Sequence, residues 1–173
     1  MLLSQLPFMP AFYDQYIRKV PECSHLDALQ YSCDLSHFIP VTALDELKHY
    51  SYAPDKWTVS DILQHLIDTE RILSYRALRF ARSDSSVLSG FDENDYARHA
   101  MANQRSIEDL LSEYQLVRQS SIHLFQSFSE TMLLRTGICY EIKVSVASLA
   151  FIIAGHPIHH MQIIGERYIP SSV

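Results

Sequence analysis

Apolar side chains recur every three or four residues between positions 59 and 78, and this spacing constrains the fold more than any other feature. The period is that of one face of an α-helix, formed here by Val59, Ile62, Leu63, Leu66, Ile67, Leu73, Ala77 and Leu78. Three arginines, Arg71, Arg79 and Arg82, fall on the opposite, solvated side. Thr58 followed by Asp61 matches a helix N-cap with a capping box. The sequence thus predicts an amphipathic helix from 58 to about 82.

Three further long helices are expected from apolar periodicity and from the positions of proline, which favours helix starts and stops. They span residues 22–39, 104–130 and 145–168, with a short helical piece near 43–49. The segment 83–96 is expected to be a polar loop, and the connection near 133–145 could hold a brief extended turn. Only 4 glycines and 7 prolines occur in 173 residues, which favours few, long elements. We therefore expect an all-α fold, a four-helix bundle over residues 21–169 preceded by an N-terminal lead-in over 1–20.

Charge and hydropathy exclude several classes of protein. The net charge is -6, so the basic surplus of a nucleic-acid-binding protein is missing. No stretch approaches the roughly 18 apolar residues of a membrane span, and the N-terminus lacks the basic region of a signal peptide. Cys23, Cys33 and Cys139 form no C-x-x-C pair and are expected to be reduced thiols. These features predict a cytoplasmic protein.

The segment AGHPIHHMQIIGERY, residues 154–168, places two histidines four residues apart on the expected fourth helix. His156 and His160 then lie on one face, one turn apart, beside apolar side chains that should face the core. Imidazoles at this spacing can bind one metal ion. Because such a pair also arises by chance, two hydrogen-bonded core histidines are the alternative interpretation.

A third histidine, His65, lies mid-way along the second expected helix, beside its apolar stripe. A bundle can bring these two helices together at this depth, and three histidines leave an open position, as catalytic metal sites do. The candidates for residues that contact the metal-binding histidines, or that transfer protons, are Asp61, Asp68 and Glu70. His159 is a further candidate at the edge of the expected site. Since Glu70 falls within the apolar stripe, it should either pair with an arginine or support the metal. No residue can be assigned as catalytic.

Pro157 falls inside the last helix, where its ring clashes with the carbonyl group of residue 153 and its N–H is missing. We expect the helix to bend or be interrupted at Gly155–Pro157.

The last helix is also apolar on the side opposite His156, at Ala147, Ala150, Phe151, Ala154, Ile158 and Met161. This face must be covered by a second subunit or by the N-terminal lead-in, and we expect a homodimer.

Three motifs together resemble the DinB/YfiT-like superfamily of metal-dependent four-helix bundles. These are a Trp-Thr helix start at Trp57, a histidine eight residues later, and the C-terminal G-H-x-x-H-H at 155–160. The similarity covers residues 20–169. It implies an up-down-down-up bundle, often dimeric, with a divalent metal ion, zinc or nickel, on His65, His156 and His160.

The resemblance implies two reactions for a small-molecule substrate: thiol S-transfer with a low-molecular-weight thiol, or metal-dependent hydrolysis. It does not imply DNA binding. A non-catalytic, dimeric helical binding module with structural or vestigial histidines is the alternative.

Overall fold

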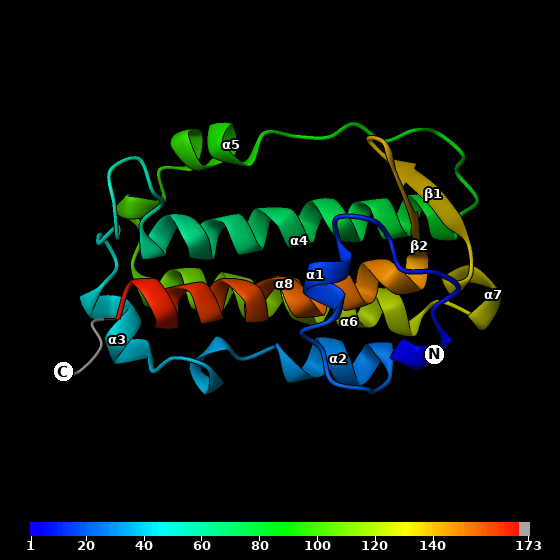
Figure 1. Ribbon diagram of the computed structural model, residues 1–173, viewed down its shortest axis with the longest axis horizontal. Helices are drawn as coiled ribbons and strands as arrows, with labels where there is room; N and C mark the ends of the chain where they lie inside the picture. The colour runs from blue at the N-terminus through cyan, green and yellow to red at the C-terminus, as the bar shows by residue number, and fades with distance from the viewer. Residues whose placement is uncertain (170–173) are drawn as a thin grey trace.

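Three long helices form most of the protein, whose computed structural model is described here for residues 1–169 (Figure 1). They are α4 (Val59–Ala81), α6 (Ile107–Gln126) and α8 (Val146–Arg167). The fourth arm of the bundle is built from short pieces: α2 (His25–Tyr31), the 3₁₀ turn Leu35–His37 and α3 (Val41–Glu46). The smaller elements are α1 (Asp14–Ile17), α5 (Glu93–Ala100), α7 (Glu130–Leu133), β1 (Thr136–Cys139), β2 (Ile142–Ser145) and the 3₁₀ turns Leu3–Gln5 and Ala102–Gln104.

The helix predicted from 58 to 82 is present as α4, and its cap is the predicted one. The Thr58 backbone N–H donates to the Asp61 carboxylate at 3.0 Å, and the Asp61 N–H donates to the Thr58 hydroxyl at 3.1 Å. Two orphan donors of the first turn are thereby satisfied, which holds the start of α4 at a definite residue. The mid-helix position of His65 follows from this start.

The predicted continuous helix over 22–39 is wrong, because the chain breaks after α2. The Ser32 carbonyl group accepts a hydrogen bond from the Tyr114 hydroxyl at 2.6 Å instead of continuing the helix. Two residues later the Asp34 carboxylate accepts the Ser36 N–H at 2.9 Å and caps the 3₁₀ turn. Such local side-chain caps compete with helix continuation.

Two connections contain more structure than expected. The predicted polar loop 83–96 includes the start of α5, which Asp92 caps by accepting the Asp95 N–H at 2.9 Å. The predicted extended turn is an antiparallel hairpin of β1 and β2, with Thr136 paired to Ser145 and Cys139 to Ile142. The fold is therefore mostly helical, with a two-stranded sheet at the end of the bundle away from α3 (Figure 1).

Helices α4 and α6 run in the same direction, as their contacts show. From the start of the two helices toward their ends, Gln64 contacts Arg105, Arg71 contacts Glu113 and Ser74 contacts Ser121. The connection through α5 returns the chain along α4 before α6 begins (Figure 1). Helix α8 runs the opposite way, so its C-terminal Tyr168 bonds the carbonyl group of Trp57 at the start of α4.

The apolar face of α8 opposite the histidines is covered within the chain. All six of its residues are buried, and α8 packs there against α1 and α2. At Gly155 an added Cβ would lie 2.0 Å from the Tyr16 carbonyl oxygen, so glycine permits the close approach of α1. Because this face is already covered, it gives no support to the homodimer prediction. Within residues 1–169 no helix is both long enough and apolar enough to cross a membrane.

The expected interruption at Pro157 does not occur, since α8 is one helix from Val146 to Arg167. Pro157 lacks the N–H that would bond the carbonyl group of Ile153. The Arg118 guanidinium of α6 donates to that carbonyl oxygen instead, at 3.0 Å. Arg118 is fully buried and also forms a two-bond pair with Glu70 of α4, 2.8 Å at each oxygen. A partner from another helix thus replaces the bond that proline removes.

We predict that Arg118→Met lowers the free energy of unfolding by about 3–5 kcal/mol, because Glu70 would remain charged, buried and unpaired. The ion pair of the exposed Arg71 with the half-buried Glu113 provides the control, and Arg71→Gln should cost less than about 1 kcal/mol. Urea unfolding of both variants measures the two values. A loss near that of the control for Arg118→Met would contradict the role given to the buried pair.

Candidate metal centre

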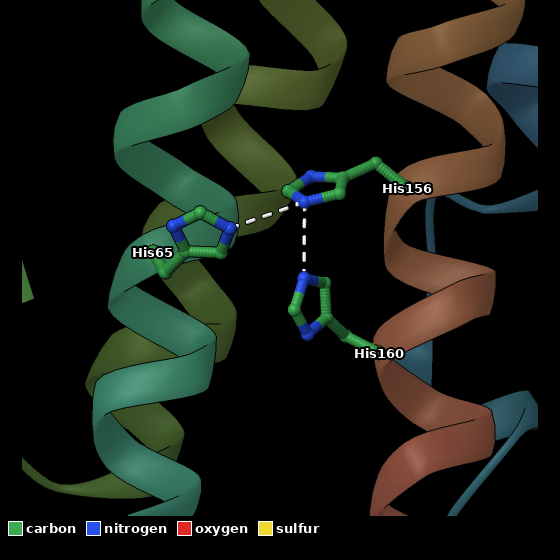
Figure 2. Close-up of side chains that lie close together, drawn as sticks. All are labelled: His65, His156 and His160. Atoms are coloured by element: carbon green, nitrogen blue, oxygen red, sulfur yellow. Dashed lines mark hydrogen bonds between the residues drawn. The ribbon is translucent and has the colours of Figure 1, made fainter. Parts of the chain in front are cut away.

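Three histidine side chains meet between α4 and α8 (Figure 2). His65 projects from α4, while His156 and His160 project from successive turns of α8. The Nε2 atom of His156 lies 3.1 Å from that of His65 and 3.0 Å from that of His160. One nitrogen atom from each ring lies within 4.8 Å of the other two. These are the three residues that the sequence singles out.

Hydrogen bonding alone does not satisfy this arrangement. An imidazole nitrogen carries either one hydrogen or one lone pair, so the Nε2 atom of His156 forms a full hydrogen bond with only one of its two neighbours. A divalent cation accepts a lone pair from all three. Two nitrogens about 2.0–2.1 Å from one ion lie about 2.8–3.4 Å apart for angles of about 90–109°. Both close distances fall in this range, so the donor set fits a metal ion.

Burial keeps all three imidazoles in the neutral form that binds metals. It lowers the pKa of His65 from 6.5 to about 4. Burial also lowers the pKa of His156 and His160 well below 6.5, and each is lowered further by the neighbouring histidines. At neutral pH the site therefore presents lone pairs and carries no charge of its own.

Neighbouring side chains hold the rings in place. The Trp57 ring lies 4.6 Å from the His65 ring and is stacked 6.4 Å from His160, between ring centroids. Tyr16 packs edge-on against His156, with 5.0 Å between the ring centroids. The Thr69 hydroxyl lies 3.3 Å from Nδ1 of His65, so a hydrogen on Nδ1 would leave the Nε2 lone pair facing the other histidines.

A cavity of about 270 Å³ opens onto the three histidines. Its walls combine aromatic and apolar side chains with a few polar ones, Thr69, Arg76, Glu93 and Asn94 among them. The sequence analysis missed Arg76, although eleven residues are about three helical turns and place it on the same face of α4 as His65. It missed Glu93 because α5 was expected to be a loop.

The acidic candidates lie outside this cavity. Asp61 caps α4 and accepts a hydrogen bond from Asn103 at 3.1 Å. Asp68 accepts from Gln64 at 2.9 Å, and burial raises its pKa. Glu70 pairs with Arg118, which is the arginine alternative stated for it. The half-buried His159 lies at the edge, with its ring 5.2 Å from those of His160 and Tyr16.

The fold and the site together define a helix-bundle protein with a three-histidine cluster beside a cavity. The model of the DinB superfamily matches residues 35–164, and the chain belongs to this superfamily. The fold is similar to that of YfiT from Bacillus subtilis, described as a probable metal-dependent hydrolase with an unusual four-helix bundle topology. The TM-score is 0.68 at 17% identity, over 89% of this chain and 84% of that one. No curated protein matches the sequence.

We predict that the metal-free protein loses stability as the pH falls from about 6.5 to about 4. In this window the unfolded chain protonates His65 whereas the folded chain does not, so His65 alone accounts for about 3 kcal/mol. Urea unfolding in the presence of a chelator should show a steeper loss for the native sequence than for His65→Asn. Parallel pH profiles of the two proteins would contradict the neutral, buried His65.

Proposed function

We propose that this protein is a metal-dependent enzyme in which His65, His156 and His160 bind a divalent ion, zinc or nickel. The observation that carries the proposal is the convergence of three Nε2 atoms at the wall of a cavity. Three neutral protein ligands leave room for an exchangeable ligand, the pattern of catalytic rather than structural zinc sites. The description of YfiT as a probable metal-dependent hydrolase supports the same class of reaction.

A bound divalent ion would lower the pKa of a water molecule or a thiol and provide a nucleophile near neutral pH. The chain supplies orientation and shielding. The Thr69 hydroxyl fixes the ring of His65, while Trp57 packs against His65 and Tyr16 against His156, which restricts access of water. The cavity then holds a small substrate next to the ligands. We propose that the nucleophile is water in hydrolysis or a low-molecular-weight thiol in S-transfer.

Two finer features complete the proposal. The first is an up-down-down-up order, with α2–α3 as the first arm, α4 and α6 as the parallel pair and α8 as the last arm. The second is a cytoplasmic location, which the cysteine usage supports.

A non-catalytic helical module is the competing function. Metal binding distinguishes the metal-dependent enzyme from this module.

We predict that the purified protein binds one Co²⁺ per chain and that His65→Ala weakens the affinity at least about a hundredfold, since a whole ligand is lost. Trp57 is the sole tryptophan and packs against His65, so its fluorescence should be quenched on binding. The exposed His123 gives the control: His123→Ala should bind as the native protein does. A folded native protein that binds no Co²⁺, Zn²⁺ or Ni²⁺ would favour the non-catalytic module.

The homodimer stays a prediction that rests on the family resemblance, because the α8 face is covered within the chain. Sedimentation velocity at micromolar concentrations should give twice the chain mass of 19.9 kDa. A mass of one chain across this range would contradict the dimer and leave the metal proposal intact, since all three ligands come from one chain.

A further inference from the structure

A second polar group, Arg76, lines the cavity beside the three histidines. It lies on α4, and only 4% of its surface is exposed. Its guanidinium donates one hydrogen bond to the carbonyl oxygen of Ser89, at 2.7 Å. Among residues 1–169, no carboxylate lies within ion-pair distance of Arg76. A guanidinium is charged at all physiological pH values. Arg76 is therefore a buried positive charge, and no residue among 1–169 supplies its counter-ion.

The other buried arginine of the bundle shows what full compensation looks like. Arg118 pairs with Glu70 through two hydrogen bonds and donates further bonds to the carbonyl groups of Leu29 and Ile153 and to the Ser32 hydroxyl. Arg76 has no comparable partner set. Because burying an unpaired charge is costly, an anion that enters from the cavity would offset the cost at this position.

The surroundings of Arg76 favour an anion from outside the chain. Tyr13 lies close to it: burial raises the pKa of this phenol, while the charge of Arg76 and a hydrogen bond between the two side chains oppose the rise. Burial also raises the pKa of the Cys139 thiol, and the charge of Arg76 opposes that rise. Both groups are therefore neutral at pH 7 and do not neutralise the guanidinium. Glu93 lines the cavity too, but it forms no ion pair with Arg76 among residues 1–169.

The cavity has two chemically different ends. His65 and Arg76 are eleven residues apart on one face of α4, so their Cα atoms are separated by about 16 Å. Between them the wall is largely apolar, with Thr69, Leu73, Ile152 and Phe91. A molecule that fills it needs an apolar middle, a reacting group at the histidines and an anionic group at Arg76.

We propose that Arg76 binds a carboxylate of the substrate and that the substrate is an elongated, largely apolar carboxylic acid. This inference rests on the proposed function for the identity of the reacting end. A guanidinium matches a carboxylate through two parallel hydrogen bonds, and the substrate would not have to displace a carboxylate already paired with Arg76. Arg76 is then a substrate-positioning residue that selects for the acid over uncharged analogues.

The first test uses the metal-free protein, so that it does not depend on metal binding. Hexanoate and 1-hexanol are titrated while the fluorescence of Trp57, which lines the cavity, is recorded. We expect hexanoate to bind about tenfold or more tightly than hexanol, as a charge-assisted pair provides. The preference should fall to about one in Arg76→Gln, persist in part in Arg76→Lys, and be unchanged in the exposed control Arg71→Gln. Equal binding of hexanoate and hexanol by the native protein would overturn the proposal.

The second test uses the Co²⁺-loaded protein with 6-mercaptohexanoate and 6-mercaptohexanol, followed by the thiolate-to-cobalt absorption band. The acid should produce the band at a concentration about tenfold lower than the alcohol. This difference should appear in the native protein and in Arg76→Lys, and it should be lost in Arg76→Gln.

If no Co²⁺ binds, the proposed function fails, while the hexanoate titration still decides the role of Arg76. If Co²⁺ binds but acid and alcohol perform alike in both tests, the Arg76 proposal fails alone. Should Arg76→Gln not fold, Glu93→Gln decides: removal of a negative charge from the cavity wall must strengthen hexanoate binding, and unchanged binding counts against the proposal.

Discussion

The buried pair of Arg118 and Glu70 connects all four arms of the bundle. Arg118 projects from α6, Glu70 from α4, and the remaining bonds of the guanidinium reach Leu29 and Ser32 of the α2 arm and Ile153 of α8. The pair is fully enclosed, so each of these bonds forms in a low-dielectric setting where an unmade bond is costly. The relative heights of α4 and α8, and with them the heights of His65 and His156, depend on this one side chain.

The same arginine explains why a proline is tolerated between His156 and His160. Pro157 follows His156 directly and leaves the Ile153 carbonyl group without its helical donor. A helix usually kinks or breaks at such a point, which would change the angle between the His156 and His160 rings. Because Arg118 supplies the missing hydrogen bond, α8 remains one helix and the two imidazoles stay one turn apart, with their Nε2 atoms 3.0 Å from each other.

Those parts of the fold that depend on local periodicity could be predicted from the sequence. Helix α4 starts after Thr58 because the cap and the apolar stripe agree, and the pairing of His156 with His160 follows from helical spacing. The break after α2 could not be predicted in this way, since it depends on Tyr114, which bonds Ser32 from 82 residues away. The tertiary partner of Ile153 was hidden for the same reason. Helical spacing alone could have placed Arg76 on the same face of α4 as His65, but nothing in the sequence shows that Arg76 has no acidic partner.

The N-terminal segment belongs to the site as much as the long helices do. Gly155 lets the backbone of Tyr16 approach α8 to a distance that any side chain at position 155 would prevent. Tyr16 is thereby placed against His156 and His159, and Phe12 and Tyr13 extend the same wall toward Arg76. Both ends of the cavity are thus shaped by residues 12–16, which the sequence presents only as a lead-in. Since α1 itself has four residues and little intrinsic stability, its position depends on packing against α8. The shape of the cavity is therefore coupled to the same helix that carries two of the three histidines.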